Sequence, residues 1–197
     1  MILSNIEIQK AINEGRLSIN PRPQPEEPDS ASGDCPYQTS SVDLRLADEI
    51  TFFKEGLALN IDLRLGNFSD LFGPNSESRK IANDQPYSLA PGKFVLAKTR
   101  ELVSLPILMD GRTCLAARVE GKSSYARCGL LVHFTAPTIH SGFTGTITLE
   151  LINLGPLPVL LYPGAAIRQL IVEEVAGVPF RNDSQFQNQT RASGQNN

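Results

Sequence analysis

The sequence is poor in the residues with which proteins usually hold zinc. Only two of its 197 residues are histidine and three are cysteine, and no Cys-x-x-Cys pair occurs. Zinc-dependent nucleobase deaminases require a His-x-Glu and a Pro-Cys-x-x-Cys motif, because these residues ligate the metal that activates water. A structural zinc site requires a comparable set of ligands. We therefore expect no zinc and no metal site built from protein side chains.

An excess of basic residues is also missing. The 18 lysines and arginines are outnumbered by 21 aspartates and glutamates, which gives a formal net charge of −3 and a pI near 5.4. Broad electrostatic binding of nucleic acid needs a basic face, so we expect no nucleic-acid partner. A run of about 18 apolar residues, the length that spans a bilayer, does not occur either, and no membrane span is predicted.

Signs of export are missing as well. Cys35, Cys114 and Cys128 are odd in number and far apart, which suits reduced thiols rather than a disulfide framework. The first residues, MILSNIEIQKAINEGR, lack the basic stretch followed by an apolar core that marks a signal peptide. These features predict a cytoplasmic protein.

Two common nucleotide-binding motifs and one catalytic motif are absent. The sequence contains neither the GxxxxGK[ST] pattern of a P-loop nor the GxGxxG pattern of a dinucleotide site. Ser123 and Ser124 lack the sequence context of a nucleophile elbow, although counting residues alone does not exclude a Ser-His-acid triad. The sequence therefore favours chemistry without zinc and without a covalent nucleophile.

The first element that the sequence does predict is a short helix in residues 4–15. Ser4 and Glu7 form the S-x-x-E pattern of a capping box, in which each side chain satisfies a free amide of the first helical turn. Ile8 and Ala11 fall on one apolar face, and Gly15 provides a stop.

Most of the remaining chain has the pattern of short strands separated by turns. This spacing predicts an antiparallel β-sandwich or barrel-like fold rather than α/β units. Residues 55–90 are mixed, with turn signals at GPNSES and NDQPYS. The predicted strands are residues 40–46, 93–99, 113–120, 129–135, 145–154, 158–162 and 165–175.

Two segments do not have the pattern of regular structure. Residues 20–36 contain five prolines and several acidic residues, which predicts an exposed loop. Residues 181–197 are rich in Asn, Gln and Ser and nearly free of large aliphatic residues, which predicts a flexible tail. We expect one domain, residues 1–180, followed by this tail.

Glu150 is the first candidate for chemistry. In the strand 145–154, Thr146, Thr148 and Glu150 share one face, and the alternate aliphatic residues share the other. Glu150 is either a solvated glutamate on an ordinary strand or a pocket carboxylate, in which desolvation would favour a general base. In both interpretations of Glu150, the tight turn at Gly142–Gly145 sets the direction in which this strand starts.

The second candidate is a polar group inside EGKSSYARCGLLVH, residues 120–133. Lys122, Ser123, Ser124 and Arg127 together form a donor cluster suited to phosphate, although each residue alone is more typical of a polar turn. His133 lies among aliphatic and aromatic residues and is interpreted as a satisfied core histidine.

Several stretches of the sequence resemble a known protein family. The stretch EGKSSYARCGLLVHFTAPTIHSGFTGTITLELINLG, residues 120–155, resembles the core signature of the dCTP deaminases in the dUTPase-like superfamily. Because several ordered blocks match, the resemblance is more specific than any single motif. The flanking blocks that are similar are MILSNIEIQKAINEGRLSI, SSVDLRLADEITFF, PYSLAPGKFVLAKTRELVSLP and YPGAAIRQLIVEEV.

The resemblance implies a mainly β, dUTPase-like distorted barrel with a short N-terminal helix, assembled as a homotrimer with active sites between subunits. It implies zinc-independent hydrolysis of dCTP to dUTP and ammonia. Glu150 would be the general base for water attack on the cytosine ring. Ser123 and Arg127 would orient that water, helped by the carbonyl of Ala136.

The resemblance also implies a binding site for the rest of the nucleotide. The backbone of Thr148 and Leu149 would contact the pyrimidine edge, and Gln189 of the tail would close over the triphosphate. Mg²⁺ would accompany the phosphates rather than sit among protein ligands. The implied substrate-binding residues are Lys122, Ser123, Ser124, Tyr125, Ala126, Arg127, His140, Thr148, Leu149, Glu150, Gln169 and Gln189.

The chain departs from the family pattern at three positions. Where the family has IDPGF this chain has IHSGF, so His140 replaces an aspartate expected at the deoxyribose, which in dUTPases activates the hydrolytic water. Gln185 stands where the family has lysine, and Phe180 where it has tyrosine. A lost charged hydrogen bond to phosphate costs about 1.5–3 kcal/mol, roughly 10- to 150-fold in binding.

We therefore predict a dCTP deaminase that acts in pyrimidine deoxynucleotide synthesis. A dUTPase or a bifunctional deaminase-diphosphatase is one alternative, although the loss of the aspartate at His140 counts against phosphate-ester hydrolysis. A nucleotide-binding trimer without turnover, acting as a regulator, is the other. dUTP and the feedback ligand dTTP are further candidate ligands.

Overall fold

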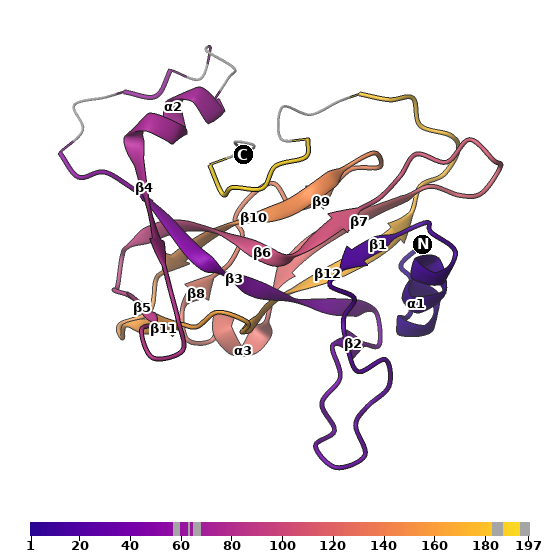
Figure 1. The fold of residues 1–197 in the computed structure, drawn as a ribbon, viewed down its shortest axis with the longest axis horizontal. Coiled ribbons are helices and arrows are strands. Elements are labelled where there is room, and N and C mark those ends of the chain that lie inside the picture. The colour runs from indigo at the N-terminus through magenta and orange to yellow at the C-terminus, as the bar shows by residue number, and fades with distance from the viewer. Residues whose placement is uncertain (57–59, 63, 65–67, 183–186, 194–197) are drawn as a thin grey trace.

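The computed structural model describes residues 1–56, 60–62, 64, 68–182 and 187–193, and strands dominate this part of the chain (Figure 1). The helices are α1 (Asn5–Asn13), α2 (Phe68–Asn75) and α3 (Ser123–Ala126). The strands are β1 (Ser18–Asn20), β2 (Tyr37–Gln38), β3 (Ser41–Phe53), β4 (Ser76–Lys80), β5 (Tyr87–Leu89), β6 (Phe94–Ser104), β7 (Leu115–Gly121), β8 (Leu130–Leu131), β9 (Thr138–Ile139), β10 (Thr144–Asn153), β11 (Val159–Leu161) and β12 (Ala166–Glu174).

Helix α1 begins and ends where the sequence predicts. The hydroxyl of Ser4 accepts a hydrogen bond of 3.3 Å from the amide of Glu7, as an N-cap does. Ile8 and Ala11 are buried against the sheet, and Gly15 adopts a positive φ of 70° just after the helix.

Most of the strands form one antiparallel sheet that is curled. Its main path is β8-β10-β6-β3-β12-β7-β9, with β1 attached to β6 and both β2 and β4 attached to β3. The two ends of this path, β8 and β9, are joined only by residues 132–137. Because the seven residue steps from Leu131 to Thr138 reach at most about 25 Å, this short segment limits how far apart the two ends can lie. The predicted mainly β, barrel-like fold is confirmed.

The apolar side chains that hold the sheet curled fall into two clusters. One packs α1 against the sheet and includes Leu44 and Leu170. The other lies beneath β10 and includes Leu149 and Ile167. Both clusters contain residues of β3, β6, β10 and β12, so the strands that carry the site are fixed on their inner face.

The prediction of a strand at residues 129–135 is wrong for most of its length, because only Leu130 and Leu131 pair, as β8. The backbone amide of Leu154 donates to the Gly129 carbonyl at 2.8 Å, so the pairing with β10 begins at this end of the segment. A Cβ atom added at Gly129 would lie 2.3 Å from the backbone nitrogen of Gly155, so the position requires glycine. Residues 123–126, predicted as strand edge or turn, form the one-turn helix α3.

The other predicted segments agree with the structure or are extended by it. The strand predicted at 40–46 continues to Phe53, and the GPNSES turn is instead the junction of α2 and β4. The 20–36 segment carries no helix and no strand beyond Asn20, and it forms a loop that extends away from the sheet (Figure 1). Within the described residues, no helix has the length and apolar character needed to cross a bilayer.

Candidate active site

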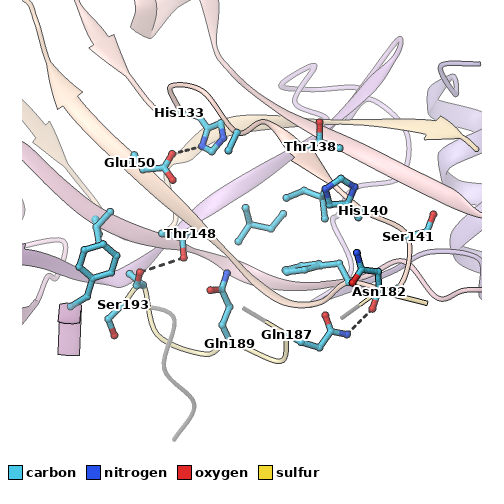
Figure 2. Close-up of a pocket in the computed structure, with 18 of the residues that line it drawn as sticks. His133, Thr138, His140, Ser141, Thr148, Glu150, Asn182, Gln187, Gln189 and Ser193 are labelled. Carbon is cyan, nitrogen blue, oxygen red and sulfur yellow. Dashed lines mark hydrogen bonds and ion pairs between the residues drawn. The ribbon is translucent and has the colours of Figure 1, made fainter. Parts of the chain in front are cut away.

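A cavity of about 480 Å³ lies on the outer face of β6 and β10, beneath the C-terminal segment (Figure 2). This volume is in the range of small-molecule sites. Apolar side chains make up part of the wall, and polar groups from three segments face one another across it. These polar groups include His133, Thr138, His140, Thr148, Glu150, Gln187 and Gln189.

Strand β10 places Glu150 at this cavity. The burial pattern of β10 alternates along its whole length, so Thr148 and Glu150 face the cavity while Leu149 points into the core. Glu150 lies opposite Leu96 of β6 in the ladder. The predicted division of faces is confirmed, and Glu150 lies in a pocket rather than on an open strand.

His133 contacts this carboxylate, and the sequence did not predict this contact. Its Nδ1 lies 2.5 Å from Oε2 of Glu150, with side-chain exposures of 8% for His133 and 30% for Glu150 (Figure 2). The prediction of a satisfied core histidine is wrong, because His133 is partly buried, lines the cavity, and has no well-aligned hydrogen bond at either ring nitrogen. The two residues are 17 positions apart and meet only because the 132–137 segment folds over β10.

The turn between β9 and β10 places the two other predicted groups from this region. His140 and Ala136 both line the cavity. The amide of Phe143 donates to the carbonyl of His140 at 3.2 Å, and Gly142 has a φ of 90°, so the predicted tight turn before β10 is confirmed.

The C-terminal segment closes the cavity along the outer edge of β10. The amide of Thr146 donates to the Gln189 carbonyl at 3.1 Å, and the Gln189 side chain donates back to the Thr146 carbonyl at 2.9 Å. Gln187 donates to the Gly142 carbonyl at 2.6 Å. Gln189 therefore lies at the cavity as predicted, while Gln185 lies outside the described residues.

The predicted phosphate-binding donors lie elsewhere on the same chain. The residues from Lys122 to Arg127 are in and beside α3, and none of them lines the cavity. Lys122 is engaged by Asp43 of β3, with 2.5 Å between Nζ and Oδ2. Gln169 of β12 is also away from the cavity, in register with Asp43 and Glu120. One chain thus brings together only part of the predicted site.

A second residue missed by sequence analysis is Arg168, on β12. It is fully buried, and its Nη1 donates to the Thr148 carbonyl at 3.5 Å. Burial lowers the pKa of Arg168 to about 9, while the charges of Glu150 and Glu120 oppose this shift. The sequence contains one signal for the burial of Arg168. In an alternating strand it falls on the same face as Leu170 and Val172, which are core residues.

No group of three or more His, Cys, Asp or Glu residues suited to a metal ion occurs within the described ranges. All three cysteines belong to these ranges and are free thiols.

Comparison with known proteins identifies the family. A family model described as dCTP deaminase-like matches residues 2–175. The chain is 43% identical over 171 residues to a Dictyoglomus turgidum protein named dCTP deaminase, dUMP-forming, covering 86% of this chain and 78% of that one. It is 38% identical over 195 residues to a Methanosphaera stadtmanae protein of the same name, covering 96% and 90%.

Among solved structures, a 2'-deoxycytidine 5'-triphosphate deaminase from Agrobacterium tumefaciens has the same fold, with a TM-score of 0.61 and 18% identity. The match covers 87% of this chain and 47% of that one, so this chain spans about half the length of that protein. The chain belongs to the dCTP deaminase-like family.

Proposed function

We propose that this protein catalyses the hydrolytic deamination of dCTP. Two relatives that match this chain over 78% and 90% of their own length are named dCTP deaminase, dUMP-forming. The observation that carries the proposal is the Glu150 carboxylate, which faces a cavity of small-molecule size and contacts the ring of His133. A solvated glutamate on an ordinary strand would have neither feature.

Glu150 would act on the water that attacks the cytosine ring. As the water oxygen bonds to ring carbon 4, the carboxylate takes a proton from it, and the resulting intermediate carries both oxygen and nitrogen on that carbon. The carbon–nitrogen bond then breaks, and the amino group receives the proton and leaves as ammonia. His133 orients the carboxylate, and a general base of this kind contributes about 10²–10⁴-fold to the rate.

A complete site would need two subunits. The donors of α3 do not reach the cavity of their own chain, and they suit a triphosphate better than the apolar cavity wall does. We propose a homotrimer in which Ser123 and Arg127 of one subunit complete the cavity of its neighbour. Mg²⁺ would be bound through phosphate oxygens and water, as is usual for this ion at nucleotide sites.

Two products are candidates. Deamination alone yields dUTP, and the replacement of aspartate by His140 at the cavity favours this outcome. A second hydrolysis, between the first and second phosphates, would yield dUMP and pyrophosphate. The names of the relatives, which include dUMP-forming, favour this second candidate.

The first test is incubation with dCTP and Mg²⁺, with ammonia and pyrophosphate measured in parallel. We expect ammonia release, and we expect Glu150→Gln to reduce it by at least about 10²-fold, because the amide keeps its size but cannot accept the proton. Release of pyrophosphate in the same assay would show that dUMP, the second candidate product, is formed. A Glu150→Gln variant that keeps most of the activity would remove Glu150 from the mechanism.

A further inference from the structure

The cavity that holds Glu150 has walls of two kinds. Figure 2 shows His140 and Gln187 toward one end of it and Glu150 toward the other. The polar side chains of the described wall come from β10, from residues 133–141 and from the segment after β12. The side chains that β3, α2 and β6 contribute are all apolar, namely Phe53, Phe72, Phe94 and Leu96.

The strand register places this apolar wall beside Glu150. Glu150 pairs with Leu96 of β6, and Leu96 pairs with Thr51 of β3, so the three residues form one row across the sheet. Side chains two positions apart on a strand point to the same face, which puts Phe53 and Phe94 in the next row. Both rings line the cavity. The carboxylate therefore lies at the border between the polar and the apolar wall.

Ring contacts hold this end of the cavity from two sides. Phe72 of α2 meets Phe53 edge to face, with 5.4 Å between ring centroids. Phe94 stacks on Phe134, which belongs to the segment that carries His133, at 5.9 Å. The space bounded by Phe53, Phe72, Phe94 and Leu96 is called the aromatic compartment below.

Cytosine has one polar and one apolar edge, which suits these two walls. Its oxygen, its ring nitrogen 3 and its amino group need hydrogen-bond partners, whereas carbons 5 and 6 carry only hydrogen. Water attack brings carbon 4 to Glu150, and carbon 5 is bonded directly to carbon 4. With the polar edge on the polar wall, carbon 5 faces the aromatic compartment, whose side chains offer an apolar substituent contacts and no hydrogen-bond partner.

We propose that the aromatic compartment receives an apolar group at carbon 5 of the pyrimidine, so that 5-methyl-dCTP is a substrate of this site. The inference rests on the proposed function, because it places carbon 4 at Glu150. The water oxygen bonds to carbon 4, the carbon–nitrogen bond breaks, and ammonia leaves as before. The product is a thymine nucleotide, and water is the only co-reactant.

Binding without turnover is the first measurement, because a methyl group also changes the reactivity of the ring. Glu150→Gln is titrated calorimetrically with dCTP and with 5-methyl-dCTP in the presence of Mg²⁺. We expect 5-methyl-dCTP to bind about fourfold more tightly or better, the effect of burying one methyl-sized group. Binding of 5-methyl-dCTP that is no tighter than that of dCTP would overturn the proposal.

Turnover is the second measurement. Initial rates of ammonia release are measured for the wild type with dCTP, 5-methyl-dCTP and 5-hydroxymethyl-dCTP. The hydroxymethyl group is close in size to methyl but brings a hydroxyl, which lacks a partner among the side chains of the aromatic compartment. We expect 5-methyl-dCTP to be deaminated, with a kcat/KM about fivefold or more above that of 5-hydroxymethyl-dCTP. Equal values for these two nucleotides would show that carbon 5 faces open space.

Variants locate the effect within the cavity. Phe72→Ala and Phe94→Ala come from different elements, so one can be used if the other does not fold. In each, the ratio of kcat/KM for 5-methyl-dCTP to that for dCTP should fall about fourfold, since the methyl group loses its contacts. Phe143→Ala is the matched control, because this phenylalanine lines the same cavity beside His140, and its ratio should stay that of the wild type. An unchanged ratio in a folded Phe72→Ala or Phe94→Ala variant would contradict the proposal.

The two proposals fail in different ways. If the wild type releases ammonia from neither dCTP nor 5-methyl-dCTP, the proposed function is wrong, and the two dissociation constants still decide what the aromatic compartment binds. If dCTP is deaminated and 5-methyl-dCTP is not, the proposed function stands and the inference about carbon 5 is wrong.

Discussion

Glu101 is a buried carboxylate that lies outside the cavity. It is 1% exposed on β6, and its Oε2 accepts a hydrogen bond of 2.8 Å from the amide of Arg45. The Arg45 guanidinium lies near the other oxygen, with 3.7 Å between Nε and Oε1. Burial raises the pKa of Glu101, and the Arg45 amide and side chain only partly oppose it.

This shift predicts a pH dependence of stability with a defined sign. Because the folded pKa of Glu101 lies above the unfolded one, the folded state holds its proton more tightly. The contribution is full below the usual glutamate pKa of about 4.3 and is lost as pH rises through the folded pKa. Glu101→Gln, which cannot ionise, should therefore gain stability relative to the wild type as pH rises from about 4 to 7.

The measurement is the free energy of unfolding by urea at several pH values, for wild type and Glu101→Gln. Glu77→Gln, at an exposed position of β4, is the control and should show no such trend. A difference between wild type and Glu101→Gln that stays constant with pH would show that the Glu101 carboxyl titrates alike in the folded and unfolded chain.

The element that covers the cavity, residues 187–193, depends on one backbone position of β10. Gly145 has a φ of 153°, and a Cβ atom added there would lie 3.1 Å from the carbonyl oxygen and 3.2 Å from the nitrogen of Gln189. Only glycine lets the tail approach this closely. Lys98 and Thr148 then hold the tail through the carbonyls of Thr190 and Ala192.

Gly145→Ala should therefore release the tail. We expect hydrogen exchange at the amides of Thr146 and Asn188 to become about 10-fold faster or more, and KM for dCTP to rise. Gly92→Ala is the matched control, because Gly92 also has a positive φ, of 73°, but has no atom within 4 Å of the added carbon. Unchanged exchange in Gly145→Ala would show that the tail is not held by this contact.

The elements of this chain differ in how far local sequence predicts them. The N-cap of α1 at Ser4 and the alternation of β10 are local patterns, and both are confirmed. The close approach of Gly129 and Gly155 joins two parts of the chain that no local pattern relates. The His133–Glu150 contact is non-local as well, since it joins a loop to a strand.

The site shows the same limit. The face on which Glu150 lies could be predicted because its strand alternates cleanly, whereas its role as a base was implied only by the family resemblance. Arg168 was missed because an arginine among aliphatic residues is usually taken as an exposed position of an amphipathic strand, although its phase with Leu170 indicates the core. The separation of α3 from the cavity is not visible in the sequence, where His133, a residue of the cavity wall, follows Ala126 by only seven positions.

At the scale of the whole molecule, the separation of Glu150 from α3 makes assembly testable through activity. If the site lies between subunits of a cyclic trimer, Glu150 of one chain works with Arg127 of its neighbour. Glu150→Gln and Arg127→Ala would each be inactive alone. In trimers formed from both, a site that combines the intact Glu150 of one variant with the intact Arg127 of the other is complete.

Such mixed trimers should regain activity in a predictable amount. In a random equal mixture, a given site takes its Glu150 from an Arg127→Ala chain in half of the cases and its Arg127 from a Glu150→Gln chain in half, so about one quarter of sites are complete. The two variants are co-refolded, mixed assembly is verified by native mass spectrometry, and ammonia release is measured. Glu150→Gln mixed with a Glu150→Gln/Arg127→Ala double variant is the control and should stay inactive, because no chain then supplies an intact Glu150. Verified mixed trimers without activity would show that the two residues do not meet across a subunit interface.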